Sequence, residues 1–215
     1  MSEFSFTVDP AFNKQHNELD RDVRKLQISA VVFGLILLAI GFGASRLYRG
    51  AVGNLLFVGM IVMALIAFAI VFVIPKKTGN AQAMYDQFPL APAIIAEVNP
   101  RSLTIMALVD RSVHPDNPDT GHQWALATRT VMNIPGVEKK VGARLPVVAV
   151  AGSRSPFHQD TWDEISPMPI GWATEDKDVI AAAIKAIPSN QWSRLDKNRE
   201  KVTEVQQTKF NLLPL

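Results

Sequence analysis

Two long runs of apolar residues lie close together near the N-terminus. Residues 26–44 and 55–74 contain no Asp, Glu, Lys or Arg. A helix rises about 1.5 Å per residue, so each run can cross a hydrocarbon core of about 30 Å. The pattern predicts a hairpin of two transmembrane helices over residues 26–74. Two runs so close together argue against buried helices of a soluble protein, and the polar residues before the first run argue against a cleaved signal peptide.

Small residues follow one face of the first run. Ala30, Gly34, Gly41 and Ser45 are spaced by four and seven positions, which places them on one side of a helix. Small side chains let another helix approach closely within a membrane. We expect this face to pack on the second run, and the alternative is a groove for a helix of another protein.

Basic residues flank the two runs unequally. Arg46 and Arg49 lie between the runs. Those outside the runs are more numerous: Lys14, Arg21, Arg24, Lys25, Lys76 and Lys77. Because Lys and Arg accumulate on the cytoplasmic side, we expect a multi-pass protein of the cell membrane with both termini in the cytoplasm. Residues 1–25 then form a cytoplasmic tail, and Lys25, Lys76 and Lys77 contact lipid headgroups.

The rest of the chain is patterned like a water-soluble domain. Residues 75–92 are interpreted as a connector, because Pro89 and Pro92 favour extended backbone. Short apolar stretches separated by proline- or glycine-bearing turns then predict five strands, at residues 93–98, 102–110, 122–133, 142–152 and 169–173. Such strands favour a small barrel or a strongly curved sheet. Gly142 and Pro146 suit an edge or a bend better than a central strand.

Two helices are expected to close this domain, which spans residues 93–215. Thr174 and Ser189 are their predicted N-caps, with Pro188 between the helices. Apolar residues at helical spacing form the inward faces, namely Ile180, Ala183, Ile184, Ile187, Trp192, Leu195 and Val202. The predicted fold is a membrane-anchored α+β protein: a two-helix transmembrane hairpin plus a small five-stranded β-barrel-like domain closed by two C-terminal helices.

The composition excludes several kinds of site. The chain has no cysteine, which rules out disulfides, thiolate catalysis and Cys-ligated zinc or iron–sulfur clusters. Its 22 Lys and Arg nearly balance its 20 Asp and Glu, so the basic surplus typical of nucleic-acid binding is missing. The sequence has no glycine-rich phosphate loop and no dinucleotide fingerprint, and we predict no cofactor.

One loop contains the residues best suited to hold a metal ion. His114, Asp116, Asp119 and His122 could gather around a divalent cation. Asp, Asn, Pro and Gly are also the ordinary residues of a solvated turn. A plain loop is the favoured interpretation, and no metal is predicted.

A second loop holds other candidates for chemistry. Residues 152–158 include serines and His158, which could form a nucleophile–base pair, but the segment has no nucleophile elbow. Asp160, Asp163 and Glu164 could pair as acid and base, although a solvated turn is favoured. A small basic cluster comprises Lys139, Lys140 and Arg144. It could meet lipid phosphates or an acidic partner, although an ordinary hairpin surface is favoured. No catalytic residue is assigned.

Aromatic and apolar side chains supply the candidate contacts with a partner protein. Trp162 lies among acidic residues in a predicted loop, and tryptophan is common at binding hot spots. Trp124 and Trp192 are expected in the core. The apolar C-terminus is expected to dock on its own domain; the alternative is insertion into a partner or the membrane through Phe210, Leu212 and Leu213.

The order of these features resembles a family of uncharacterised actinobacterial membrane proteins. The likeness rests on the two apolar runs, on the motifs at residues 134–136, 142–147 and 165–172, and on the terminal helix pair. That family carries no known activity. Small membrane proteins of this size also occur as accessory subunits of actinobacterial respiratory supercomplexes, a role for which no motif is present here.

Two functions are therefore compared. The favoured one is a non-catalytic, membrane-tethered adaptor or accessory subunit of a larger membrane complex, because catalytic constellations are missing. The alternative is an enzyme that binds a small molecule or a lipid headgroup at the barrel mouth, around His114 and His122. Expected partners are membrane lipid and another membrane protein, with no nucleic acid.

Overall fold

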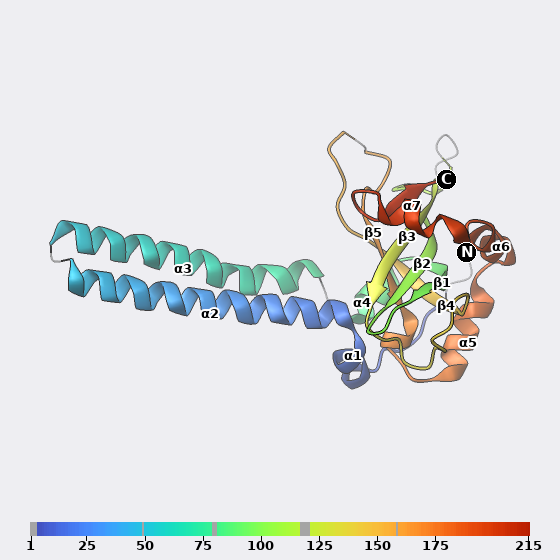
Figure 1. The fold of residues 1–215 in the computed structure, drawn as a ribbon, viewed down its shortest axis with the longest axis horizontal. Helices are drawn as coiled ribbons and strands as arrows, with labels where there is room; N and C mark the ends of the chain where they lie inside the picture. Colours follow the sequence, from blue (N-terminus) through green and yellow to red (C-terminus); the bar gives the residue numbers. More distant parts are fainter. Residues whose placement is uncertain (1–3, 49, 79–80, 117–120, 158) are drawn as a thin grey trace. The chain divides into compact units, whose positions relative to one another are not determined.

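The computed structural model describes residues 4–48, 50–78, 81–116, 121–157 and 159–215, without the side chains of residues 70 and 72–78 (Figure 1). The chain divides into two compact units. We call Asn17–Asn80 the hairpin unit, and Met1–His16 with Ala81–Leu215 the β unit. Each unit is described by itself.

The hairpin unit consists of two long helices, α2 (Glu18–Leu47) and α3 (Ala51–Thr78), that run side by side (Figure 1). Asn17 caps α2 by accepting a hydrogen bond from the backbone N–H of Leu19. The turn between the helices is so tight that a Cβ on Gly53 would lie 1.7 Å from the carbonyl oxygen of Tyr48. Only glycine fits there, so the turn holds the two helices close together.

The small residues of α2 lie against α3. A Cβ built on Gly34 would come 2.6 Å from the ring of Phe68, and one on Gly41 would come 2.8 Å from Cβ of Met60. Ala30 is also buried, whereas Ser45 is half-buried and donates to the carbonyl of Phe42 in its own helix. The glycines therefore serve the contact within the hairpin.

The outward faces of these helices are apolar. Large side chains such as Phe33, Ile36, Leu55 and Leu65 are exposed. In the apolar 18-residue stretches of the two helices, only 11% and 17% is buried. A core helix of a soluble protein would bury most of that surface. The two helices are long and apolar enough to cross a bilayer, and this exposure fits lipid as their surroundings.

The β unit is built on one antiparallel sheet of six strands in the order β5-β4-β1-β2-β3-β6. The strands are β1 (Leu90–Val98), β2 (Leu103–Asp110), β3 (Trp124–Val131), β4 (Arg144–Ala151), β5 (Ile165–Pro169) and β6 (Leu212–Pro214). The α+β class and the first four predicted strands are confirmed. The five-stranded barrel is wrong, because the sheet has six strands and stays open as a half-barrel with β5 and β6 at its edges.

Prolines explain the misplaced fifth strand. Residues 170–172 form a 3₁₀ helix, η1 (Ile170–Trp172), and the strand precedes it. Pro167 and Pro169 are tolerated in β5 because it is an edge strand.

Pro146, expected at an edge or a bend, instead lies in the interior strand β4 opposite Pro92. The β4–β5 ladder begins only at Val147, so the missing N–H of Pro146 breaks no ladder bond.

The sheet curls strongly. Arg129 of β3 donates to Oγ of Ser166 in β5 (3.1 Å), and its guanidinium lies 5.1 Å from the ring centroid of Trp172. These strands are far apart in the sheet order, so only a curved sheet brings them together. Buried alanines such as Ala93 and Ala107 permit the close approach.

Three helices cover the face of the sheet opposite the Arg129 side chain: α5 (Lys177–Ala186), α6 (Ser189–Lys197) and α7 (Val202–Gln206). They bury a cluster that includes Ile94, Met106, Leu126 and Trp192. The predicted helix pair is thus present, and α7 follows it after a short 3₁₀ turn, η2 (Arg199–Lys201).

The caps of α5 and α6 differ from the predicted ones. Asp176 caps α5 by accepting hydrogen bonds from the N–H groups of Asp178 and Val179, while Thr174 accepts from the N–H of Asp176 itself. Ser189 is the first residue of α6 and caps nothing with its side chain. Both cap predictions were wrong: the N-cap of α5 is Asp176, two residues after Thr174, and the N-cap of α6 is Pro188, one residue before Ser189.

The C-terminus returns to the sheet. β6 pairs with residues Ala125–Ala127 of β3. Leu212 is buried, Leu213 packs against the core cluster, and Phe210 is 38% exposed. Of the three apolar residues, only Phe210 offers an exposed side chain.

Candidate binding pocket

A cavity of about 510 Å³ opens at the end of the sheet where β1 begins and β2 and β4 end. Its walls come from these strand ends, from the α5–α6 turn, and from the segment that links α4 (Ala81–Gln87) to β1. Leu90, Leu108, Val148 and Ile187 make much of the lining apolar. A volume of this size suits a small ligand or the body of a larger one.

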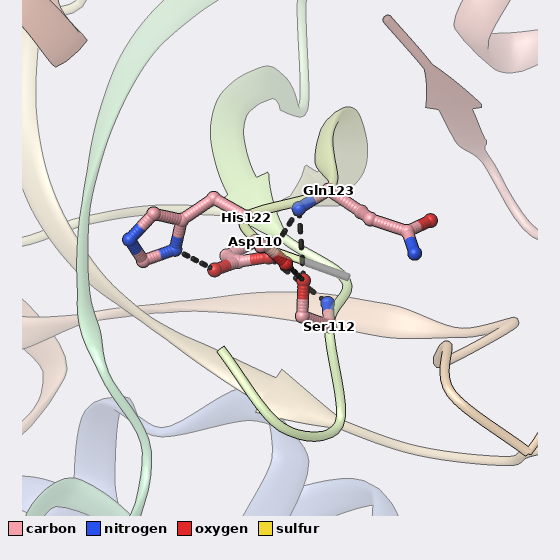
Figure 2. A network of polar contacts seen from close by, with 5 residues as sticks. Asp110, Ser112, His122 and Gln123 are labelled. Carbon is pink, nitrogen blue, oxygen red and sulfur yellow. Dashed lines mark hydrogen bonds and ion pairs between the residues drawn. The ribbon is translucent and has the colours of Figure 1, made fainter. Parts of the chain in front are cut away.

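One end of the cavity is polar, and it is organised around Asp110. The β2–β3 register pairs Asp110 with Trp124, which brings His122 beside the carboxylate. Oδ2 of Asp110 lies 2.5 Å from Nδ1 of His122, and Oδ1 accepts the backbone N–H groups of Ser112 (2.9 Å) and Gln123 (3.0 Å). Figure 2 shows His122 on one side of the carboxylate and Ser112 with Gln123 on the other.

These contacts determine the charge of Asp110. Burial by itself would raise the pKa of the carboxyl, but the hydrogen bonds from His122, Ser112 and Gln123 outweigh it and lower the pKa below its usual 3.8. Asp110 is therefore an anion at neutral pH and can only accept hydrogen bonds. Nδ1 of His122 is therefore the donor in its contact with the carboxylate, and Nε2 is the ring nitrogen left for other partners.

The lowered pKa of Asp110 makes a testable prediction about stability and pH. The ionised carboxylate stabilises the folded state at pH values above 3.8, and this contribution is lost as the pH falls through the lower folded-state pKa. We expect the stability difference between the wild type and Asp110→Asn to shrink as the pH falls from about 5 to about 2. Urea unfolding at a series of pH values measures it. A difference that stays constant down to about pH 2 contradicts the prediction.

Ser112 does not complete a hydrolytic triad with this pair. Its hydroxyl donates to the carbonyl of Gly121 (2.8 Å) and accepts the N–H of Gln123 (2.8 Å). Ser112 and His122 approach opposite oxygens of Asp110, whereas a nucleophile would have to reach Nε2 of the histidine. Within the described residues no hydrogen bond reaches Nε2. The arrangement therefore presents a histidine ready to bind, and none of the described residues lies beside it as a nucleophile.

Aromatic stacking supports the same end of the cavity. The rings of His122 and Trp124 are 5.4 Å apart, and the guanidinium of Arg194 from α6 lies 5.7 Å from the Trp124 ring. Trp124, expected in the core, packs against the core cluster but is only half-buried, and it also lines the cavity. A flat ligand group has an aromatic surface to stack on here.

The loop considered as a metal site does not gather its four candidate residues in the part of the chain that the structure describes. His122 pairs with Asp110, His114 is exposed, Asp116 is exposed, and Asp119 lies outside the described residues. Among the described residues no three His, Asp or Glu side chains are grouped so that they could hold a metal ion. Sequence reasoning singled out His122 but missed Asp110, because that residue reads as the end of a strand.

The loop at residues 152–164 is braced by its acidic residues. Asp163 accepts the N–H of Ser155 (2.6 Å), and Glu164 accepts the hydroxyl of Ser153 (2.9 Å). Trp162 is half-buried, with the guanidinium of Arg154 5.5 Å from its ring. His158 lies outside the described residues, and Asp160 is exposed.

Phe157, which the sequence analysis did not single out, is an exposed aromatic residue of that loop. It is 92% exposed. An isolated Phe between Pro156 and a histidine carries no periodic signal, so nothing in the sequence sets it apart from a buried one.

The basic residues singled out from the sequence lie on the surface or outside the described residues. Arg144 forms an ion pair with Asp196 (2.6 Å) and lies over Trp192, while Lys139 and Lys140 are exposed. Lys25 is exposed and 3.5 Å from Asp22. Lys76 and Lys77 belong to α3, but their side chains, like Arg49, lie outside the described residues.

Comparison with known proteins gives a family and one solved structure. The model of a family described as "protein of unknown function (DUF3239)" matches residues 76–203. The crystal structure of a "putative membrane protein" from Corynebacterium diphtheriae is 55% identical, with a TM-score of 0.55, and covers 59% of this chain and 100% of its own. No curated protein matches. The resemblance to uncharacterised actinobacterial proteins is thus supported, and the apolar helices together with this relative indicate a membrane protein.

Proposed function

Since this chain belongs to the DUF3239 family, to which no function is attached, we propose its role from its own geometry: it is a membrane-tethered binding protein for a small amphiphilic ligand. The cavity of about 510 Å³ beside the Asp110–His122 pair carries the proposal. The apolar body of the ligand lies against Leu90, Leu108 and Ile187. Its hydrogen-bonding group meets Nε2 of His122.

The chemistry of the pocket favours binding over catalysis. Asp110 holds the histidine in one orientation, and Ser112 is already engaged by Gly121 and Gln123. A fixed imidazole at the rim of an apolar cavity selects a ligand with one polar end. The proposal therefore keeps the ligand class of the enzyme considered from the sequence, a small molecule or lipid headgroup, but assigns binding without catalysis.

The hairpin unit serves this role as an anchor. It keeps the pocket at the membrane, where amphiphiles are concentrated. The excess of Lys and Arg outside the apolar runs supports an orientation with both termini in the cytoplasm. The β unit and its pocket would then lie on the cytoplasmic side of the cell membrane.

Binding of 11-(dansylamino)undecanoic acid to the full chain in detergent tests the proposal. Trp124 lines the cavity, so a bound probe should show saturable energy transfer from tryptophan. Ala186→Phe, which adds a ring to the cavity wall on α5, should weaken binding at least about tenfold, because one buried ring occupies space that the probe needs.

Ala182→Phe is the matched control. Ala182 lies on the same helix, is exposed and does not line the cavity, so this variant should bind the probe like the wild type. Absence of saturable transfer in the wild type, or equal binding by the two variants, would refute the proposal.

A second candidate function is the adaptor or accessory subunit of a larger membrane complex. The exposed Phe157, on a loop braced by Asp163 and Glu164, favours it, since an exposed aromatic side chain suits a partner's pocket. Co-purification of another membrane protein after mild detergent extraction tests this role, and Phe157→Ser should abolish that recovery.

A further inference from the structure

The N-terminal residues 4–9 lie on the β unit and are held there by a side chain of α4. The amide of Gln82 accepts the backbone N–H of Val8 through Oε1 (2.8 Å) and donates to the carbonyl of Phe6 through Nε2 (2.9 Å). One side chain thus satisfies a donor and an acceptor of the same segment. We call residues 4–9 the strap.

Aromatic contacts connect the strap with the wall of the cavity. Phe6 meets Tyr85 edge-on with ring centroids 5.3 Å apart, and Phe4 lies 5.8 Å from Phe6. Phe4 and Tyr85 both line the cavity. The first residue of the strap is therefore part of the pocket wall.

The two ends of the strap are held differently. Asp9 donates its backbone N–H to the carbonyl of Ala173 (2.9 Å), and its carboxylate caps α1 (Pro10–His16) by accepting from Ala11 and Phe12. Val8 is buried. At the other end Phe4 has only its ring contact with Phe6 among the interactions of the described residues, so the strap is best anchored at Asp9 and weakest at Phe4.

We propose that the strap is a movable wall that gates the pocket, opening at the Phe4 end while Asp9 stays anchored. This inference rests on the proposed binding function. Segments held by few contacts open locally without unfolding of the domain. Release of the Gln82 clamp frees the backbone of Phe6 and Val8 together, so that Phe4 leaves the cavity and the ligand can enter or depart.

Gln82→Ala tests the gate, because Gln82 holds the strap and does not itself line the cavity. In the full chain, the association and dissociation rate constants of 11-(dansylamino)undecanoic acid, measured by stopped-flow energy transfer, should both rise at least threefold. The dissociation constant should change little. Hydrogen exchange of the Val8 amide, measured in parallel, should accelerate.

Gln206→Ala is the matched control. It also removes a glutamine amide that forms a hydrogen bond, in this case to the carboxylate of Glu97. This variant should leave both rate constants unchanged. Faster exchange at Val8 with unaltered probe kinetics would overturn the gate. If Val8 stays protected in Gln82→Ala, the clamp is refuted, and a chain lacking residues 1–7 decides whether the wall matters: unchanged rates there overturn the proposal. A wild type that binds no probe refutes the binding function instead.

Discussion

Replacing Trp172 by alanine is expected to lower the free energy of unfolding of the β unit by about 3–5 kcal/mol. The side chain is fully buried where η1 follows β5. Its indole N–H donates to the carbonyl of Asn133 (2.9 Å), and Arg129 covers its ring. The variant loses the buried surface of the ring, opens a cavity and removes the hydrogen bond that ties η1 to the segment following β3.

Urea unfolding of the full chain in detergent, followed by tryptophan fluorescence, measures this effect. All four tryptophans belong to the β unit, so the signal reports on that unit alone. Trp162→Ala is the control: Trp162 is half-buried and packs under Arg154, and its loss should cost about 1 kcal/mol. Equal destabilisation by the two variants would contradict the place given to Trp172 in the core.

The features predicted well from the sequence depend on local patterns. The helices that contain residues 26–44 and 55–74 were predicted because an unbroken apolar run of that length has few other interpretations. The strands β1 to β4 were predicted because turns with proline or glycine interrupt their apolar stretches. Both signals lie within a window of about twenty residues, which is the range over which sequence patterns act.

The features that were missed depend on contacts between distant segments. β6 has three residues and is a strand only because β3 offers an unpaired edge. β5 contains two prolines, which its own sequence would exclude from a central strand. In both cases the neighbouring strand, and not the local propensity, decides the structure.

The candidate site shows the same limit. His122 was singled out as a residue able to do chemistry, but its partner Asp110 lies across a hairpin whose register the sequence did not specify. The cavity walls come from Phe4, Tyr85 and Ile187, which are distant in sequence. The presence of polar candidates was thus predictable, and the pocket that gives His122 its significance was not.

Replacing Gly41 by leucine should separate the helices of the hairpin. A Cβ at this position already comes 2.8 Å from Cβ of Met60, so a larger side chain forces α2 away from α3. Overpacking of this kind costs about 1–3 kcal/mol. Lipid supplies no hydrophobic drive to restore the contact, so we expect the loss to appear directly as weaker helix pairing.

Disulfide formation within the membrane can measure this separation, because the chain has no cysteine of its own. Leu37 and Ala64 are both buried, and they lie at the same level between the Gly34–Phe68 and Gly41–Met60 contacts, so cysteines at these two positions should be oxidised readily by copper phenanthroline. Gly41→Leu should slow that reaction several-fold, an effect on the order of 1 kcal/mol. Gly43→Leu, on the same helix but with no atom within 4 Å of its Cβ position, should leave the rate unchanged. If both leucines slowed the reaction equally, bulk in α2 would be responsible, and the close contact at Gly41 would not be what holds the hairpin together.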